Sequence, residues 1–332
     1  MRVDGTSTPV PRFWRFRGPQ DLPGLVAVRA AVRQVEDGVW MPGPDTVTDP
    51  AAQTPFCLVA GVGGQTVGYT WMDWWTEVDG SRLYLLLGWV VPAWRRHGIG
   101  TAMLRWQEQQ AAAFAATHAG PGVAVLGGNA DEDQPDTRAL LLANGYRVAF
   151  TVVWMARDLT AEPVGQRVGQ QVAEATLPAG IELRPVAHVH HPRIHRAIEE
   201  CFAEDRTGHL PRTFAEYRHD VRERQSDTTL WTVAWDGDEI AAVMINEIRP
   251  NGTGLTPWLA VRAPWRRRGI GRALMLIGLR RLSERGVTST ALATIAQNPH
   301  HSAALYQSLG YRVTRRQPRY RKPMAQAFGR TG

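Results

Sequence analysis

The feature that most constrains this chain of 332 residues is an internal repeat. Residues 90–104 and 261–275 share Trp-Arg-Arg followed by Gly-Ile-Gly at matched positions, with an offset of 171 residues from Val90 to Val261. A period of this length indicates a duplicated structural unit, because each copy must bury its own apolar faces. One hydrophobic core seldom supports a chain this long, so the repeat predicts two domains.

The surroundings of the two motifs repeat in the same order. A strand and a helix come first, and two apolar runs joined by a Gly-containing turn follow, which predicts a β-hairpin. The motif then opens an amphipathic helix, predicted over residues 101–116 and 272–285, and a short strand, a second helix and a last strand complete the copy. We expect an α/β fold with a mixed sheet of six or seven strands and about four helices in each copy. The predicted domains are residues 11–158 and 181–324, and residues 159–180 form the linker.

Composition narrows the classes of function. The formal net charge is +7, but the basic residues are scattered and Lys322 is the only Lys, so a phosphate-bearing small molecule is favoured over nucleic acid. Two distant Cys exclude a disulfide scaffold and a Cys-rich zinc site, and no metal is expected. The polar start of the chain and the lack of a long apolar stretch predict a cytoplasmic protein without a membrane partner.

The repeated Arg-x-x-Gly-x-Gly lies between a strand and a helix. Glycines let the backbone turn tightly there, and the N–H groups of the first helical turn attract a phosphate. A nucleotide P-loop needs Gly-Lys-Ser/Thr, which neither copy has, and a dinucleotide fold needs its glycines in the first turn after a strand, whereas these motifs follow three strands. Another kind of phosphate site is therefore indicated.

The pattern resembles the acetyl-coenzyme A motif of the GCN5-related N-acetyltransferase (GNAT) superfamily. This resemblance covers both halves and implies a tandem pair of acyl-coenzyme A N-acyltransferase domains, with acetyl-coenzyme A as the cosubstrate. It implies that the pantetheine arm binds along the strand before the motif and that the loop wraps the pyrophosphate. The residues carried over are Val261, Arg266, Arg267, Arg268, Gly269, Ile270, Gly271 and Arg272, and in the first half Val90, Arg95, Arg96, His97, Gly98, Ile99, Gly100 and Thr101.

The two halves differ in the residues that the family uses after this motif. The second half has Asn298, which the resemblance assigns to the pantetheine amides, and Tyr306, which it assigns to the coenzyme sulfur as the general acid. The first half has Leu141 where Tyr306 stands, and leucine cannot donate a proton. The second half is therefore expected to be the catalytic one, while the first binds coenzyme with little turnover or helps to build the acceptor cleft.

The general base and the acceptor site are less constrained. The fourth strand of the second half carries no carboxylate, so Glu247 is the first candidate base. Glu204 or Asp205, then His300 or His301, or a chain of water molecules could serve instead. Trp71 and Trp74 either floor an acceptor cleft or belong to the core. The candidate acceptor residues are Glu204, Asp205, Trp71 and Trp74.

The predicted function is N-acetyl transfer from acetyl-coenzyme A to a primary amine of a small molecule, by direct attack in a ternary complex. A non-catalytic acyl-coenzyme A sensor is the alternative from another class, and the altered first half is compatible with it. The protein is expected to be a monomer or a homodimer. A thiol-release assay over a panel of amines separates an enzyme from a sensor.

Overall fold

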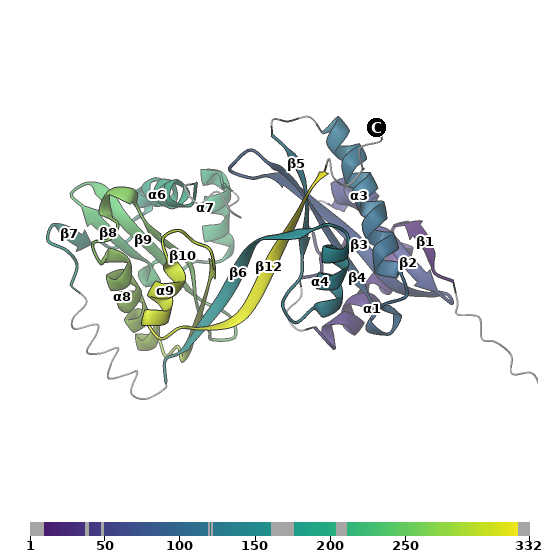
Figure 1. Cartoon of the computed structure of the whole chain (residues 1–332). Coiled ribbons are helices and arrows are strands. Elements are labelled where there is room, and N and C mark those ends of the chain that lie inside the picture. The colour runs from purple at the N-terminus through teal and green to yellow at the C-terminus, as the bar shows by residue number, and fades with distance from the viewer. Residues whose placement is uncertain are drawn as a thin grey trace, which may run out of the picture. The chain divides into compact units, whose positions relative to one another are not determined.

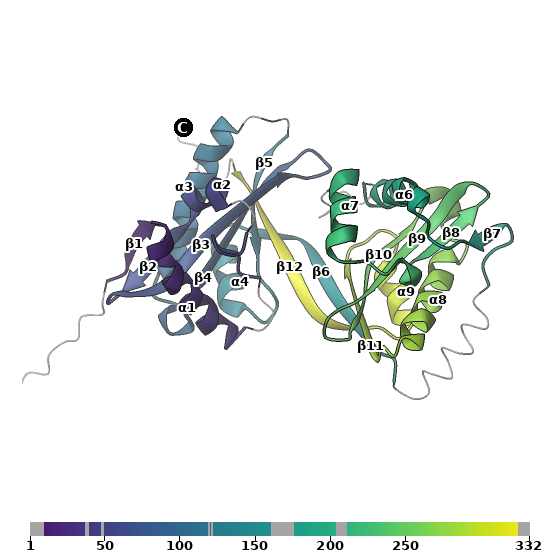
Figure 2. The same cartoon turned by 180° about the vertical axis from the view of Figure 1, so that it is seen from behind.

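The computed structural model describes residues 10–36, 40–47, 50–118, 120, 122–160, 176–203 and 211–324. The chain divides into two compact units, which Figures 1 and 2 show from opposite sides. Residues 1–149 and 317–332 form the first unit, and residues 150–316 form the second. Among the described residues, no helix has both the length and the apolar character needed to cross a bilayer.

The first unit contains a mixed sheet of six strands in the order β1-β2-β3-β4-β5-β12, as far as its residues are described. One face of this sheet packs against α1 and the other against α3 and α4. Its elements are β1 (Arg12–Arg15), α1 (Leu22–Arg33), α2 (Pro50–Gln53), β2 (Leu58–Val62), β3 (Gln65–Thr76), β4 (Arg82–Val90), α3 (Ile99–Thr117), β5 (Ala124–Asn129), α4 (Pro135–Ala143) and β12 (Arg312–Pro323).

The second unit repeats this plan with six described strands in the order β6-β11-β10-β9-β8-β7. Helices α8 and α9 cover one face of its sheet, and α6 and α7 cover the other. Its elements are β6 (Arg147–Asp158), β7 (Ile181–Leu183), α6 (His191–Ala203), α7 (Phe214–Glu223), β8 (Thr232–Asp236), β9 (Glu239–Ile248), β10 (Gly254–Val261), α8 (Ile270–Glu284), β11 (Ser289–Ile295) and α9 (Ser302–Ser308).

The last strand of each sequence repeat pairs in the sheet of the other unit. Strand β6 ends the first repeat, yet it runs antiparallel beside β11 from Val152 opposite Ile295 to Asp158 opposite Ser289. Strand β12 ends the second repeat and runs antiparallel beside β5. The compact units therefore do not coincide with the predicted domains 11–158 and 181–324, which follow the order of the chain. Residues 161–175 of the predicted linker lie outside the described residues.

Each exchanged strand brings a buried basic side chain to the Gly-Tyr pair of the unit that it completes. In the first unit the ammonium of Lys322 lies 2.9 Å from Glu108 Oε1 and 5.5 Å from the centroid of the Tyr146 ring. In the second unit Arg157 is 6% exposed and donates a hydrogen bond to the carbonyl of Leu309. Removal of one partner of a buried ion pair strongly destabilises the folded protein, so the pair between Lys322 and Glu108 stabilises the position of β12.

The observed helices begin earlier than the pattern predicts. Helices α3 and α8 start at Ile99 and Ile270, directly after the αL residues Gly98 and Gly269, rather than at residues 101 and 272. Helix α7 was not among the expected elements. Its place before the hairpin is taken in the first unit by the single turn of α2, so α7 is the main difference in architecture between the described parts of the two units.

Candidate active site

Two neighbouring strands of the second unit separate half way along their length. Strands β10 and β11 are paired in parallel only from Gly254 to Thr256. At that point a β-bulge places Thr256 and Pro257 opposite a single residue of β9, and the remainder of β10 is paired with β9 alone. Proline has no N–H to donate to a ladder, which suits it to a bulge. The residues from Trp258 to Val261 thus keep one backbone edge that no described strand occupies.

The loop after β10 holds the glycine motif in a fixed turn. Arg266 donates from Nε to the carbonyl of Val261 at 2.8 Å, so this side chain closes the turn. Arg267 and Gly269 have φ of 61° and 81°, the left-handed region. A Cβ on Gly269 would meet no atom within 4 Å, and no side chain of the described residues caps α8. The space beside Gly269 is therefore open, and the first N–H groups of α8 have no side-chain acceptor there, a geometry that fits an anion such as a pyrophosphate.

The side chains of this loop add positive charge. Arg267 and Arg268 are exposed, and neither has a carboxylate partner in the part of the chain that the structure describes. Arg272 donates to Ser308 Oγ at 3.2 Å across the start of α8 and the end of α9. Ile270 is 1% exposed, so it offers a ligand only its backbone. The turn thus combines helical N–H groups that no described side chain caps with two guanidiniums that have no carboxylate partner among the described residues.

Helix α9 brings Tyr306 close to this turn. A Cβ on Gly271 would lie 3.7 Å from Leu305, so α9 packs directly on the start of α8. Tyr306 itself is 7% exposed, and no hydrogen bond of its hydroxyl occurs within the described residues. Burial, and to a lesser degree the adjacent Tyr311, raise the pKa of Tyr306 well above its ordinary value. Its hydroxyl stays protonated at neutral pH and can donate a proton to a stronger base.

The loop between β11 and α9 carries the other candidates of this region. Asn298 accepts a hydrogen bond from the backbone N–H of His300 at 2.8 Å, which makes a local turn. The side chains of His300 and His301 are exposed on the same loop, and His301 has a φ of 54°. Neither histidine lines the pocket described next.

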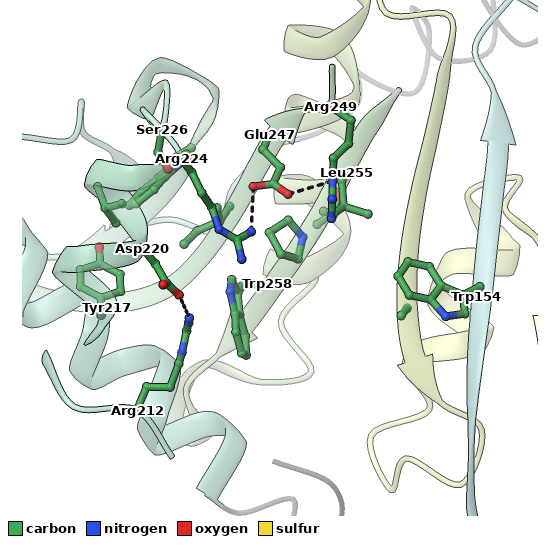
Figure 3. Close-up of a pocket in the computed structure, with 16 residues that line it drawn as sticks. Trp154, Arg212, Tyr217, Asp220, Arg224, Ser226, Glu247, Arg249, Leu255 and Trp258 are labelled. Atoms are coloured by element: carbon green, nitrogen blue, oxygen red, sulfur yellow. Dashed lines mark hydrogen bonds and ion pairs between the residues drawn. The ribbon is translucent and has the colours of Figure 1, made fainter. Parts of the chain in front are cut away.

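A pocket of about 310 Å³ opens on the opposite face of the same sheet, beside the bulge of β10 (Figure 3). Its walls come from α7 and the segments on either side of it, from β9 and β10, and from β6 and β11, which lie across the separation of the strands. The lining residues are Trp154, Arg212, Tyr217, Asp220, Val221, Arg224, Ser226, Trp231, Ile245, Glu247, Arg249, Leu255, Thr256, Pro257, Trp258 and Ala293.

The pocket and Tyr306 belong to the two faces of one sheet. Tyr306 packs in the cluster under α8 and α9, whereas Tyr217, Trp231 and Ile245 of the pocket pack in the cluster under α6 and α7. Pocket residues stand on both sides of the separation, Thr256 on β10 and Ala293 on β11. The pocket therefore lies at the point where β10 and β11 separate.

Glu247, the first candidate base, lines this pocket between two arginines. Its Oε2 lies 3.4 Å from Arg224 Nη1 and its Oε1 lies 3.2 Å from Arg249 Nε. The second carboxylate of the pocket, Asp220, is 2.6 Å from Arg212 Nη1. The guanidinium of Arg212 lies over the Trp258 ring, 4.9 Å from its centroid. Figure 3 shows these three ion pairs together on one wall, opposite Trp154.

Sequence reasoning missed most of the wall that α7 provides. The sequence does contain a signal for the start of this helix. Glu216 follows Thr213 by three residues, and this spacing is that of a capping box. In the structure the N–H of Glu216 donates to Thr213 Oγ1 at 3.2 Å, and the N–H of Thr213 donates to Glu216 Oε2 at 2.7 Å. Trp154 had no such signal, because it reaches this pocket on the exchanged strand β6.

The corresponding turn of the first unit has the same backbone and different partners. Arg96 and Gly98 have φ of 64° and 79°, and Arg95 donates from Nε to the Val90 carbonyl at 3.1 Å. Here, however, Arg95 also forms an ion pair with Glu36 at 2.6 Å. The carboxylate of Asp136 lies 3.4 Å from Arg96. Both arginines of this turn are therefore compensated by carboxylates.

The remaining candidates of the first unit lie in or beside this turn. His97 is exposed, and its Nδ1 lies 2.7 Å from the carbonyl oxygen of Arg95. Ile99 is 1% exposed, so it too can offer only its backbone. A Cβ on Gly100 would lie 3.3 Å from Leu140, so this glycine lets α3 and α4 approach closely. Thr101 follows in the first turn of α3.

The proposed acceptor residues of the first unit belong to its core. Trp71 is fully buried in the cluster under α1, so it has no surface to present to a ligand, and the core alternative holds for this residue. Trp74 packs against the rings of Phe56 and Phe114, with centroid distances of 5.7 Å and 4.9 Å. The other two acceptor candidates, Glu204 and Asp205, lie outside the described residues.

Comparison with known proteins bears on both halves. The family model described as "Acetyltransferase (GNAT) family" matches residues 27–121 and 192–311. A GCN5-related N-acetyltransferase from Sphaerobacter thermophilus has a similar structure, with 23% identity, a TM-score of 0.67 and coverage of 95% of this chain and 96% of that chain. No curated protein matches this chain.

Two further solved structures extend the likeness. A tandem GNAT protein from the clavulanic acid biosynthesis pathway is 16% identical, with a TM-score of 0.63, and the alignment covers 95% of this chain and 99% of that chain. A glucosamine N-acetyltransferase region of a fungal multi-domain GH3 β-N-acetylglucosaminidase is 18% identical, with a TM-score of 0.64. That alignment covers 96% of this chain and 39% of that chain. At these identities the likenesses concern the fold.

Proposed function

The chain belongs to the acetyltransferase (GNAT) family and is an acyltransferase, and on this premise we propose that its second unit moves an acetyl group from acetyl-coenzyme A to a primary amine of a small molecule. One observation carries the proposal. On one face of the sheet stands a helix N-terminus with two arginines that have no carboxylate partner among the described residues, and on the other face stands a pocket, at the point where β10 and β11 separate.

Arg267, Arg268 and the first N–H groups of α8 are the groups that would hold the pyrophosphate. The unoccupied edge of β10, ending at Val261, and the Asn298 loop are the groups that would hold the pantetheine arm. When bound, the coenzyme supplies an acyl group activated as a thioester. We assign coenzyme binding to the second unit, since the arginines of the corresponding turn in the first unit are paired with Glu36 and Asp136.

The acceptor amine must attack as the neutral base. Its nitrogen bonds to the thioester carbonyl carbon, the carbon–sulfur bond breaks, and the sulfur takes up a proton. Tyr306 is our candidate for the donor of that proton, because its hydroxyl is protonated at neutral pH and its helix α9 packs on the start of α8. Backbone N–H groups on the edge of β10 that no described strand occupies are the candidates for stabilising the negative charge that develops on the carbonyl oxygen.

Glu247 is our candidate for the base that takes the proton released by the amine. Its carboxylate lies in the pocket, next to the bulge, although both of its oxygens face a guanidinium. A chain of water molecules remains the alternative, and it needs no side chain. A variant Glu247→Gln separates the two, because loss of a base lowers kcat and flattens the acidic limb of its pH profile, whereas loss of an ion pair leaves that limb in place.

A narrower alternative is the reaction of mycothiol synthase, whose tandem layout this chain resembles and which acetylates the cysteinyl amine of a pseudodisaccharide thiol precursor. The described part of β10 carries no carboxylate that could meet that ammonium. A non-catalytic acyl-coenzyme A sensor is the alternative from another class. The glycine turn of the first unit, whose arginines are paired with carboxylates, suits a sensor. Tyr306 and the pocket of the second unit favour an enzyme.

The decisive experiment combines coenzyme binding with turnover. Titration calorimetry with acetyl-coenzyme A and a thiol-release assay over a panel of amines should give one bound coenzyme per chain and release of thiol with at least one class of amine. Binding without thiol release from any amine would favour the sensor. Turnover with the mycothiol precursor above all other amines would select the narrower alternative.

A further inference from the structure

The pocket beside β10 carries more guanidinium than carboxylate. Among the described residues, three arginines and two acidic residues line it, which leaves one positive charge in excess: Arg212, Arg224 and Arg249 against Asp220 and Glu247. A pocket for a simple amine or a polyamine would be expected to show the opposite balance, because an ammonium is attracted by carboxylates. The charge of this pocket instead suits a ligand with an anionic group.

The excess charge lies at Glu247. Arg212 and Asp220 form a one-to-one pair, and Arg212 is further fixed by its position over the Trp258 ring. Glu247 in contrast is shared by Arg224 and Arg249, each of which reaches it through a single nitrogen. A guanidinium has five N–H donors, so these two arginines keep most of their donors for a ligand. Their side chains are about half exposed, at 54% and 50%.

The other walls indicate a small ligand with an apolar part. Trp258 on β10 and Trp154 on the exchanged strand β6 stand on opposite sides of the pocket (Figure 3), and Tyr217 and Ile245 add further apolar surface. A volume of about 310 Å³ is at the lower end of the range for ligand pockets, roughly 300–1,000 Å³. A molecule about the size of an amino acid or a dipeptide fits such a space.

We propose that the acceptor is an amine that also bears a carboxylate, an amino acid or a close derivative of one, whose carboxylate is bound by Arg224 and Arg249. This rests on the proposed function and specifies its substrate class. Arginine matches a carboxylate in planar geometry and binds it through paired hydrogen bonds. One excess positive charge balances one carboxylate, and the amine is left to face Glu247 and the bulge of β10.

The test compares acceptors that differ only in the anionic group. Thiol release from acetyl-coenzyme A is measured with tryptophan, tryptophanamide and tryptamine, and with leucine and leucinamide. Each kcat/KM is expressed per neutral amine, because removal of the carboxylate charge changes the pKa of the acceptor amine. The acids should exceed the amides and tryptamine by about 10-fold or more, the factor expected of one hydrogen-bonded ion pair.

The outcomes separate the two proposals. Equal or better turnover of the amides and of tryptamine would overturn the assignment of a carboxylate-bearing acceptor and leave acetyl transfer standing. Absence of thiol release from every amine, with coenzyme still bound in calorimetry, would overturn the proposed function together with the assignment.

The double variant Arg224→Gln/Arg249→Gln tests the residues themselves. It should lower kcat/KM for the preferred acid by about 10- to 100-fold and for its amide by less than about 3-fold, with the KM for acetyl-coenzyme A unchanged. Arg280→Gln is the matched control, since Arg280 is an exposed arginine of α8 paired with Glu284 at 2.7 Å. A preference for the acid that survives in the double variant would overturn the assignment. Unchanged melting temperatures show that both variants are folded.

Discussion

The glycine turns of the two units share a backbone and differ in charge. The φ of Arg96 and of Arg267 are 64° and 61°, and those of Gly98 and Gly269 are 79° and 81°. In the first unit, however, the arginines of the turn face carboxylates on neighbouring segments, whereas two arginines of the second unit's turn have no carboxylate partner among the described residues. Equal backbone geometry therefore does not imply equal affinity for an anion, because neighbouring charges decide it.

A second difference concerns the element that precedes the hairpin. The second unit has the ten-residue helix α7 at this point, and its residues form one wall of the pocket. The first unit has the four-residue α2 at the same point in the chain order. Under our proposal the second unit binds the acceptor and the coenzyme, and the first sequence repeat supplies to that unit the strand β6, which carries Trp154.

The largest expected effect is that of Tyr306→Phe. Loss of the general acid should lower kcat by about 100-fold or more, or roughly 3 kcal/mol, with little change in the KM for acetyl-coenzyme A. Tyr311→Phe is the control, because Tyr311 is a second buried tyrosine of the same core cluster and its hydroxyl lies 3.4 Å from Thr290 Oγ1. Leu141→Met in the first unit should leave turnover unchanged. If Tyr306→Phe retains full kcat, the catalytic distinction between the units is lost.

Removal of the only Lys should affect stability rather than chemistry. Lys322→Met leaves Glu108 buried without its partner and should lower the free energy of unfolding by about 3–5 kcal/mol in a denaturant titration. The variant Lys322→Met/Glu108→Leu should recover most of that loss, because it removes both charges. A fall in kcat with no loss of stability would give the first unit a role beyond structure.

The turn of each unit can be tested by neutralising its arginines. The variant Arg267→Gln/Arg268→Gln should raise the KM for acetyl-coenzyme A by about 10-fold, since two charges that attract the pyrophosphate are removed. Arg96→Gln should change it by less than about 2-fold, because that guanidinium already faces Asp136. Equal effects in the two turns would mean that both bind coenzyme, and calorimetry would then give two bound molecules per chain.

The smallest expected effect is that of weakening α7. Thr213→Ala removes the capping box of this helix and should cost about 1 kcal/mol of local stability, which should raise the KM for the acceptor by a few-fold and leave the KM for acetyl-coenzyme A unchanged. Thr117→Ala at the end of α3 is the control. An acceptor KM that does not respond to the loss of this cap would argue against α7 as a wall of the acceptor site.

Much of the fold was accessible from the sequence because it depends on local patterns. The paired apolar runs with a Gly-containing turn predicted both hairpins, and the glycine motif predicted the start of the helix that follows each fourth strand, two residues late. Helix α7 was accessible through Thr213 and Glu216 but was not predicted. The pocket could not be predicted, because its lining residues are distant in the chain. Arg212 and Arg224 flank the helix that was not predicted, and Trp154 lies more than 50 residues before both of them.

The sequence by itself determined the duplicated α/β fold, the membership of the family and the contrast between Tyr306 and Leu141, since each of these is a property of neighbouring residues. The tertiary structure decided which sheet the last strand of each repeat joins and which arginines are compensated. Both depend on contacts between residues far apart in the chain, such as Lys322 with Glu108 and Arg95 with Glu36. The periodicity of a strand identifies the strand but not its neighbour, and the charge of a side chain does not identify its partner.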